Sequence, residues 1–505
     1  NAQLQAIIEG PLFMTAEELG QREREFKRLT DRLQSLHATR QLQQQLASEE
    51  LRKTERQCAD GGGRKMKYYG YREVKICFLG GLEIKLWARY YARNQARAEK
   101  GKGAYFGLLL LGVHDHCSPA LASEVAKLAA AMNSLADAKV QLEQMGVKLS
   151  KKQIAEIAYA FSQRARLRQQ IQGMGVSGSL AGKRVVISTD GGRVRIRTDK
   201  KGKRTKKGRR RYRTDWREPK LLAIYVVDEE GKNDRSFTPV LDGTLKGPDA
   251  VFGLIEQYLS KLGIDEATKV LFIADGAKWI WKRVGAMFTR LGLKPEQCLE
   301  LVDFYHVVEH LHTLAGLKKK NWSKKQKRGW VTRQTNRLKR GEVEAFMEAV
   351  RKFSKGQRGK DWRRERDYLL RNAKAGHLNY GLAREQQLPI GSGIIESTVR
   401  RVLNLRMKGA SIFWTKDNAE HMILLRAYYK SGRKYSPNPW SDGRSDRDGI
   451  SFRFHPGRRT MGEMMRVDPL SYEELERSGS AAFCSSVKRA SDRFQGKNDS
   501  GLSTA

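Results

Sequence analysis

The chain has 505 residues, 39% of them hydrophobic, and carries 97 Lys and Arg against 56 Asp and Glu, a formal net charge of +41. At roughly 100–200 residues per domain we expect about two to four domains. The longest apolar stretch, Phe106 to Val113, is far short of the roughly 20 residues that cross a bilayer, and residues 1–20 lack the pattern of a secretory signal. Five scattered cysteines without a CxxC pair favour a reducing compartment over a disulfide framework. We therefore do not expect a secreted, collagenous or membrane protein.

In a compact chain so many positive side chains repel one another unless a polyanion neutralises their charge. Nucleic acid is the polyanion that this composition favours. An anionic membrane surface and a ribosome-associated role remain as alternatives.

The first expected element is a long helix over residues 15–57, where Thr15 and Glu18 have the spacing of a capping box. An apolar seam follows at helical spacing: Phe26, Leu29, Leu33 and Leu36. This seam could pack on the rest of the protein or pair with a second copy as a coiled coil. We assign residues 1–60 to this helical unit, which could dimerise.

Residues 67–91 are rich in aromatic and β-branched residues and are interrupted at Gly80 and Gly81, which predicts two strands within a small β-rich unit, 61–117. Helical spacing returns over 118–175.

Two short helices are expected there, Leu135–Met145 and Ser150–Arg164, with Ser150 as the N-cap of the second. This pattern fits a DNA-binding helix-turn-helix, although any pair of packed helices joined by a glycine looks the same.

Residues 182–303 alternate between strand and helix and predict a mixed α/β sheet. The expected strands are Arg184–Thr189, Val194–Arg197, Leu221–Val227, Ser236–Val240, Val270–Ala274 and Leu299–Val302, and the expected helices are Asp249–Leu262 and Lys278–Leu291. Residues 304–387 predict helices joined by basic loops, and 388–431 predict two more helices. The polar segment 432–505 is expected to be mostly disordered.

Two aspartates end apolar strands of this sheet. Asp190 follows RVVIST and precedes two glycines, and Asp275 follows KVLFIA and precedes Gly276. The carboxyl edge of such strands is where sheets of this kind place their chemistry, although an Asp-Gly turn after a strand is also common. A third carboxylate, Glu396, lies near the start of a later helix.

Three converging carboxylates repel one another unless cations separate them, and Mg²⁺ prefers oxygen ligands. Two such ions about 4 Å apart would activate an attacking oxygen and stabilise the leaving oxygen in a phosphodiester displacement. The spacing therefore favours a divalent-metal site.

Four segments occur in a characteristic order: STDGG, IADGAKWIW, VDFYHVVEHL and GSGIIESTVRRVLNLRMKGASIFWT, with a long helical stretch before the glutamate. Over roughly residues 65–431 the chain resembles DDE transposases of bacterial insertion sequences, in particular the Kra group, which are kin to Mutator-like transposases. The resemblance implies a ribonuclease H-like catalytic core at 182–303 and 388–431, with an all-helical insertion at 304–387. It also implies that Asp190, Asp275 and Glu396 are the catalytic, metal-binding residues.

By the same resemblance the cofactor would be Mg²⁺ or Mn²⁺, two ions per site. Water would attack a phosphodiester at the element end, and the freed 3′-hydroxyl would attack target DNA without a covalent protein–DNA intermediate. The partners would be double-stranded DNA of the terminal inverted repeats and of the target, bound by a homodimer or larger assembly. The location would be the cytoplasm, at the bacterial nucleoid.

Three further residues would assist the site. Asp303 and His306 match the D-x-x-H signature that opens the insertion in these relatives, and Arg400 lies one turn after Glu396, where it could hold a scissile phosphate or the glutamate.

Zinc is not expected. Relatives often carry a CxxC after the tyrosine-rich strand, where this chain reads YYARNQ from Tyr90, and the spacing of Cys77, His114, His116 and Cys117 fits no standard site.

Two segments are strongly basic. Residues 200–213 contain ten Lys and Arg, and we expect a loop beside the site that binds DNA phosphates; an import signal or a solvated loop would look the same. Residues 318–371 hold twenty Lys and Arg against six Asp and Glu, with Trp322, Trp330 and Trp362. These tryptophans could contact unpaired bases, but a small helical core is favoured. The residues expected to bind DNA are Lys200, Lys201, Lys203, Arg204, Lys206, Lys207, Arg209, Arg210, Arg211, Arg213, Lys151, Lys152, Arg401, Arg406 and Lys408.

The leading hypothesis is thus a transposase. A ribonuclease H-like nuclease or junction resolvase, a non-catalytic DNA-binding protein derived from a transposase, and an RNA-binding or ribosome-associated protein remain as alternatives.

Overall fold

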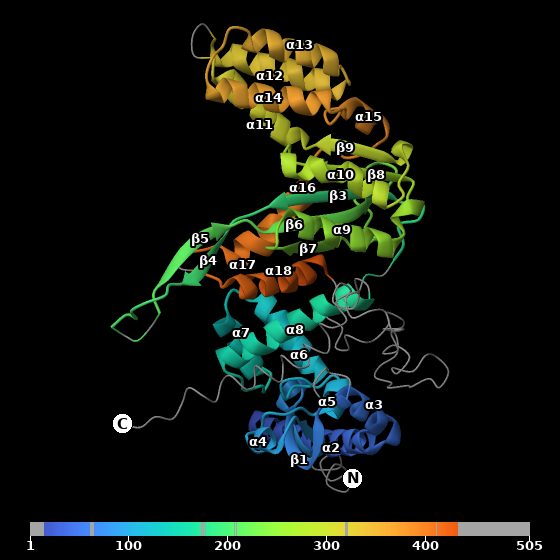
Figure 1. The fold of residues 1–505 in the computed structure, drawn as a ribbon, viewed down its shortest axis with the longest axis vertical. Helices are drawn as coiled ribbons and strands as arrows, with labels where there is room; N and C mark the ends of the chain where they lie inside the picture. The colour runs from blue at the N-terminus through green and yellow to red at the C-terminus, as the bar shows by residue number, and fades with distance from the viewer. Residues whose placement is uncertain are drawn as a thin grey trace. The chain divides into compact units, whose positions relative to one another are not determined.

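The computed structural model describes residues 15–60, 65–172, 176, 178–206, 208, 210–318, 322–410 and 412–432. The described chain forms two compact units that meet in sequence at residues 171 and 172 (Figure 1). The segment 433–505, which includes almost all of the tail expected to be disordered, lies outside the described residues.

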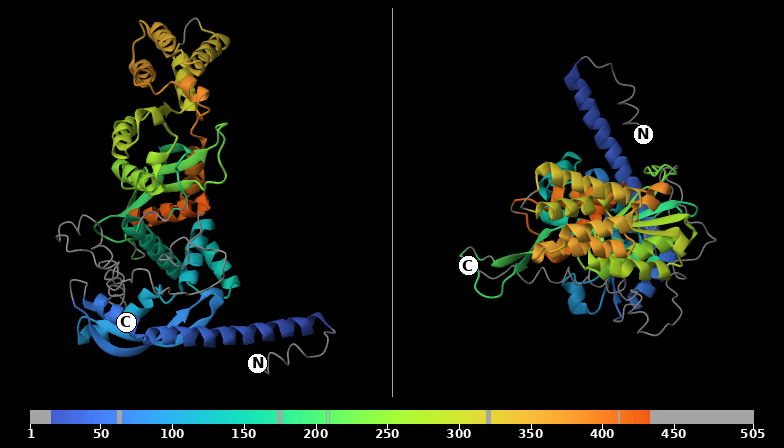
Figure 2. Two further views of the ribbon diagram at one scale, coloured as in Figure 1. Left: turned by 90° about the vertical axis from the view of Figure 1, so that its right-hand side faces the viewer. Right: turned by 90° about the horizontal axis from the view of Figure 1, so that it is seen from above.

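The N-terminal unit begins with α2 (Ala16–Ala47) and α3 (Glu49–Asp60), which are separated at Ser48 by an extended backbone conformation. The predicted capping box is confirmed, because the Glu18 amide donates to Thr15 Oγ1 at 3.2 Å and the Thr15 amide donates to the Glu18 carboxylate at 2.9 Å. Among the described residues the apolar seam is largely exposed, with Phe26 45% and Leu36 63% exposed. Figure 2 shows α2 projecting away from the small sheet of the same unit.

That sheet is the antiparallel pair β1 (Lys67–Cys77) and β2 (Glu83–Ala92), joined through the 3₁₀ turn η1 (Leu79–Gly81) as the glycine pair predicted. Its buried side packs on the end of α2 through Leu46. The helices that follow are α4 (Gln95–Glu99), α5 (Phe106–Leu110), α6 (Pro119–Ala131), α7 (Leu135–Gln144) and α8 (Lys151–Gln172).

The two helices predicted around residue 147 are α7 and α8. Ser150 Oγ accepts the Gln153 amide at 3.3 Å, which confirms the N-cap, and Gly146 joins the helices in a left-handed conformation with φ of 80°. Lys151 and Lys152 are exposed on the first turn of α8. Their contact with DNA stays a prediction.

The C-terminal unit is built on a five-stranded sheet in the order β7-β6-β3-β8-β9. Its strands are β3 (Arg184–Gly191), β6 (Lys220–Val227), β7 (Val240–Thr244), β8 (Lys269–Ala274) and β9 (Cys298–Val302). The pairs β3/β8 and β8/β9 are parallel, while β3/β6 and β6/β7 are antiparallel. The mixed α/β class expected from the sequence is therefore confirmed.

One predicted strand is wrong. Residues 235–237 form a turn, and β7 begins only at Val240. The physical reason is Pro239, which lacks the backbone N–H that a strand needs for its ladder, so the strand begins after it, four residues later than predicted.

Helices cover both faces of the sheet. The helices α9 (Pro248–Leu262) and α10 (Lys278–Arg290) share one core with alternate strand residues such as Val185 and Phe272. The intervening strand residues, such as Val186 and Leu271, face a second core formed with the helical insertion. Short 3₁₀ turns, η2 (Ile264–Glu266) and η3 (Pro295–Gln297), precede β8 and β9.

The insertion comprises α11 (Phe304–Gly316), α12 (Lys324–Lys339), α13 (Val343–Ser354), α14 (Lys360–Lys374) and α15 (Tyr380–Glu385). Trp330 stacks on Phe353 with ring centroids 4.1 Å apart, and Trp322 and Trp362 pack around the same ring. The favoured interpretation of these tryptophans, a small helical core, is confirmed.

After the insertion the chain returns to the sheet. It forms α16 (Gly393–Thr398), the π-helix η4 (Val399–Asn404), α17 (Leu405–Met407) and α18 (Lys416–Ser431). The helix α16 packs on β3 and β6, and α18 packs on β7. Within the described ranges, no helix is both long and apolar enough to cross a bilayer.

Candidate active site

Three aspartates fall in a row at the carboxyl edge of the central strands. Ile187 of β3 is paired with Phe272 of β8, so the same register carried on by three residues aligns Asp190 with Asp275. Ala274 of β8 is paired with Val302 of β9, so the next position aligns Asp275 with Asp303. Parallel neighbours thus bring to one edge three carboxylates that are far apart in sequence.

Asp190 lies at the end of β3, and its Oδ1 accepts the Gly191 amide at 2.6 Å. Burial raises the pKa of this carboxyl to about 6, and the charge of Asp275 also raises it, while the Gly191 hydrogen bond and the charges of His306 and Lys220 lower it. Asp190 and Asp275 are therefore close enough to repel each other. Lys220 is a nearby cation that sequence reasoning did not identify; it is 6% exposed and its Nζ lies 4.2 Å from the Trp279 ring centroid.

The loop after Asp275 is braced by groups from two other elements. Trp281 Nε1 of α10 donates to the Asp275 carbonyl at 2.9 Å. From α14, Tyr368 Oη accepts the Gly276 amide and Arg371 donates to the Gly276 carbonyl, both at 3.1 Å. A Cβ on Gly276 would lie 2.4 Å from the Tyr368 ring, so only glycine fits this contact. The helical insertion thus helps to fix the position of Asp275.

Asp303 is completely buried and caps α11. Its Oδ1 accepts the amides of Tyr305 at 2.7 Å and His306 at 3.1 Å, and its Oδ2 accepts the amide and hydroxyl of Ser392. Burial raises the pKa of Asp303, but the hydrogen bonds from His306 and Ser392 outweigh it and hold the pKa at about 2. An ionised carboxylate has about four acceptor sites. All four are engaged, so Asp303 holds the start of α11 and Ser392 in position, while its predicted assisting role stays a prediction.

His306 lies beside Asp303. Its Nδ1 is 3.6 Å from Asp303 Oδ1, an ion-pair distance longer than a hydrogen bond. The interaction with Asp303 raises the pKa of His306 to about 9, burial lowers it, and the charge of Asp275 adds to the increase. Without a bound metal the imidazole therefore carries a positive charge at neutral pH.

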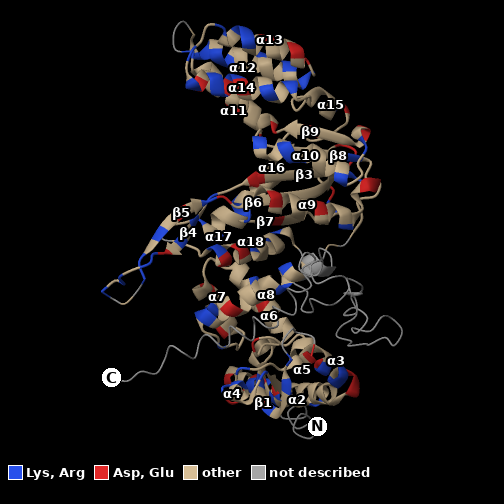
Figure 3. Cartoon of the chain, viewed as in Figure 1, with Lys and Arg blue, Asp and Glu red and all other residues tan. Residues whose placement is uncertain are grey.

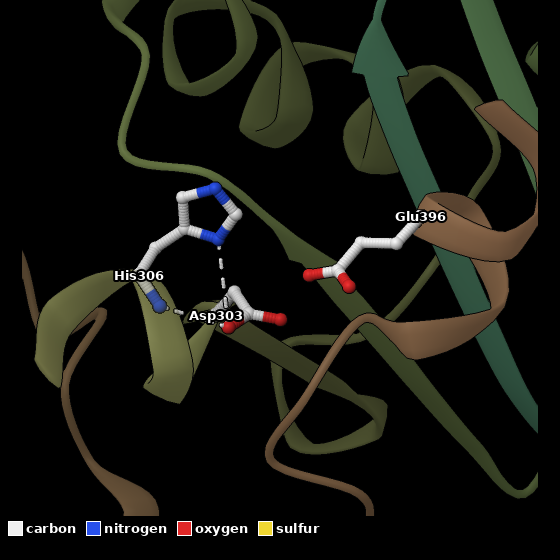
Figure 4. Close-up of side chains that lie close together, drawn as sticks. All are labelled: Asp303, His306 and Glu396. Atoms are coloured by element: carbon white, nitrogen blue, oxygen red, sulfur yellow. Dashed lines mark hydrogen bonds and ion pairs between the residues drawn. The ribbon is translucent and has the colours of Figure 1, made fainter. Parts of the chain in front are cut away.

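Glu396 comes from the other side of the site, exposed on α16. Asp303, His306 and Glu396 each offer one ligand atom, and these three atoms lie within 4.8 Å of one another (Figure 4). Within the described ranges this is the one group of His, Cys, Asp or Glu residues that could hold a metal ion. The π-helix that follows Glu396 is a geometry frequent at functional sites. The Ser392 hydrogen bonds to Asp303 fix the segment that leads into α16, a contact that sequence reasoning missed.

The structure therefore forms two groups of predicted site residues. Asp190 and Asp275 interact electrostatically across β3 and β8, and Glu396 lies with Asp303 and His306. His306 connects them, because its charge acts on Asp190 and the charge of Asp275 acts on it. This arrangement offers several carboxylates, which are donors suited to a hard divalent cation such as Mg²⁺ or Mn²⁺, beside one imidazole.

The arginines on the Glu396 segment have different environments. Arg400 is exposed one turn after Glu396, and Lys408 is also exposed. Arg406 is 6% exposed, with its guanidinium 5.5 Å from the Trp414 ring centroid. We therefore correct the expectation that Arg406 offers a surface contact to DNA, because packing on Trp414 buries it. Arg401 is partly buried.

The basic segment 200–213 is also different from the expected simple loop. Its described residues follow β4 (Val194–Asp199) and run into β5 (Tyr212–Arg217), which pairs with β4 in a second, two-stranded sheet and was not predicted. Lys207 and Arg209 lie outside the described residues, and the other predicted DNA-binding residues of this segment are exposed. Figure 3 shows Lys and Arg gathered along this hairpin and over α12 and α14.

The four Cys and His residues considered for zinc do not form a comparable cluster. The backbones of Cys77 and Cys117 form an isolated β-bridge without a disulfide, and His116 Nδ1 lies 3.0 Å from the Lys75 carbonyl oxygen. Burial raises the pKa of the Cys117 thiol to about 12, which disfavours the thiolate that binds metal.

The chain matches no protein-family model and no curated protein. Among solved structures it is similar to the Drosophila P element transposase strand transfer complex, with 12% sequence identity over 62% of this chain and 78% of that chain. The TM-score is 0.22, a value at which the similarity carries no argument about this protein.

Proposed function

We propose that this protein is a DDE transposase of the bacterial insertion-sequence type, with a ribonuclease H-like catalytic core, that cleaves DNA at the ends of its element and joins them to target DNA. Two observations support the proposal in a protein with a net charge of +41: Asp190 and Asp275 end adjacent parallel strands, and Glu396 lies with Asp303, which follows the next strand. The acidic side chains are suited to bind a divalent cation, and the surrounding positive charge is suited to bind a polyanion such as DNA.

The donor set fits Mg²⁺ or Mn²⁺. In the described chain Oδ2 of Asp190 and of Asp275 accepts no hydrogen bond, and Glu396 is exposed, so these three carboxylates have oxygens to offer. Asp303, which lies with Glu396 in the group that could hold a metal ion, has less to offer because its oxygens already accept four hydrogen bonds. When bound, two such ions would activate the attacking oxygen and stabilise the leaving oxygen.

The remaining residues would bind and orient DNA. Arg400, exposed beside Glu396, would contact the scissile phosphate, and the basic hairpin and helical insertion would hold the backbone of the duplex. Hydrolysis would break the phosphorus bond to the 3′-oxygen at the element end, and that 3′-hydroxyl would then displace an oxygen of a target phosphodiester. The proposal includes a homodimer or larger assembly on paired ends and a location at the bacterial nucleoid.

The test uses labelled duplexes from the DNA that flanks the coding sequence, where inverted repeats should occur. We expect cleavage with Mg²⁺, loss with EDTA, and loss of at least about 10³-fold in Asp275→Asn, because metal ions supply several kcal/mol of transition-state stabilisation. Asp249→Asn is the matched control, since that aspartate is an exposed acid of the same unit that pairs with Arg283. Cleavage that survives Asp275→Asn defeats the proposal.

Strand transfer into a supercoiled plasmid distinguishes the remaining possibilities. Joined products support a transposase, whereas cleavage without joining identifies a nuclease of the resolvase type. Binding without cleavage identifies a non-catalytic DNA-binding protein.

A further inference from the structure

The β4–β5 hairpin carries an exposed ladder of aromatic rings and guanidinium groups. The strand β4 begins four residues after Asp190, so the hairpin is an extension of the strand that carries the first catalytic aspartate of the proposed function. Its two faces differ in composition.

The strand register separates these faces. Ile196 is paired with Asp215 and Val194 with Arg217, and both aliphatic side chains are buried, at 5% and 0% exposure. The opposite face holds the pairs Arg195–Trp216, Arg197–Thr214 and Asp199–Tyr212. Side chains alternate between the faces of a strand, so Arg195, Trp216, Arg197 and Tyr212 share one surface.

On that surface two guanidinium groups lie among three aromatic rings. The Arg195 guanidinium lies 5.6 Å from the Trp216 ring centroid and 4.8 Å from that of Phe413, which comes from the loop before α18. Phe413 lies 5.9 Å from Tyr212, and the Arg197 guanidinium lies 4.8 Å from the Tyr212 ring. The order is therefore Trp216, Arg195, Phe413, Tyr212 and Arg197.

The rings of this ladder are open to solvent. Trp216 is 54% exposed, Tyr212 43% and Phe413 36%. If these rings served only to stabilise the hairpin, burying them would stabilise it further, since burial of apolar surface contributes roughly 25 cal/mol per Å². Two acids moderate the charge, with Asp199 paired to Arg197 at 3.3 Å and Asp215 to Arg213 at 3.5 Å.

We propose that this ladder is a stacking platform for unpaired bases of DNA. Charge identifies the partner class, because residues 200–213 contain ten Lys and Arg in the sequence. The aromatic rings identify the form of DNA, because bases inside a duplex stack on one another and present only phosphates and edges, whereas unpaired bases expose their ring faces. Aromatic side chains among cations are the recurring design for single strands.

The proposal rests on the proposed function only in taking DNA as the partner. The experiment is fluorescence anisotropy of the full chain with a labelled oligo(dT) and, separately, a blunt hairpin duplex, in EDTA so that no cleavage occurs. Stacking on one aromatic ring contributes roughly 1–3 kcal/mol, so Trp216→Ala should weaken oligo(dT) binding about 5- to 150-fold and duplex binding less than about twofold. Trp216→Phe, which keeps a ring, should restore most of the affinity.

Trp87→Ala is the matched control. Trp87 is 55% exposed on the antiparallel strand β2, but its cross-strand partner is Glu73, so its surroundings do not favour a polyanion. Unchanged oligo(dT) affinity in Trp87→Ala together with the Trp216→Ala loss supports the proposal. Equal losses in both variants, or equal losses for oligo(dT) and duplex, overturn it. If wild type binds oligo(dT) and Trp216→Ala binds it equally well, the ladder proposal fails while DNA binding stands; if wild type binds neither probe, both proposals fail.

Discussion

Removal of the Asp303 carboxylate tests the interpretation that this residue positions the site. In Asp303→Ala, α11 loses its N-cap and Ser392 loses the acceptor of both its amide and its hydroxyl. Loss of an N-cap costs about 1 kcal/mol, and buried donors left without a partner cost about 1–3 kcal/mol. We therefore expect the C-terminal unit to lose about 3 kcal/mol of unfolding free energy.

For a unit that spans residues 172–435 each kcal/mol shifts Tm by about 2–4 °C, so the expected decrease is about 6–12 °C. The assay is thermal unfolding in EDTA, followed by circular dichroism. Asp303→Asn should lie between wild type and alanine, because its amide oxygen still caps α11 while its NH₂ group meets the Ser392 donor. Glu396→Ala is the control, since this exposed side chain should change stability by less than about 0.5 kcal/mol.

A Tm change below about 2 °C in Asp303→Ala would refute the hydrogen-bond geometry on which the positioning role depends. An equal decrease in Glu396→Ala would also contradict it, because it would mean that the exposed carboxylate is as structural as the buried one.

Three other predictions concern the same unit. In metal-free protein His306 has a pKa raised from 6.5 to about 9, so its stabilisation is complete below pH 6.5 and is lost as pH rises through 9. That pKa difference corresponds to about 3 kcal/mol of unfolding free energy, and because the side chain is 37% exposed, solvent screening reduces this to about 1–2 kcal/mol. Urea unfolding at pH 6 and pH 9.5 should show this loss in wild type but not in His306→Gln. Gly276→Ala should destabilise the unit by about 2 kcal/mol because its Cβ would lie 2.4 Å from the Tyr368 ring. Gly285→Ala, in open space on α10, should stabilise it by about 0.5–1 kcal/mol. Changes of the same sign in urea unfolding would contradict the tight contact at Gly276. Trp330→Ala should cost about 3–5 kcal/mol, seen as early unfolding of the insertion in hydrogen exchange, and protection equal to wild type would show that the stacked ring does not support this core.

Local patterns were enough to predict much of the chain. The apolar runs before Asp190 and Asp275 predicted β3 and β8, and the Thr15–Glu18 spacing predicted the start of α2. These features depend on side chains within a few residues of one another, so the sequence contains the relevant interaction directly.

Features that depend on distant partners were missed. The strand β5 has the sequence YRTDWR, which continues the basic segment and predicts a loop, and only its pairing with β4 makes it a strand. The Tyr368 contact to Gly276 joins residues 92 positions apart, and the Ser392 contact to Asp303 joins residues 89 apart. No local pattern encodes such contacts.

The sequence by itself determined which carboxylates end strands and which segments are basic. Only the tertiary structure decided that the three strand-end aspartates share one edge, that Asp303 uses its oxygens to hold other groups, and that Arg406 is buried on Trp414. The physical reason is that strand order and register, which set these distances, result from packing across the whole sheet and cannot be determined from any single strand.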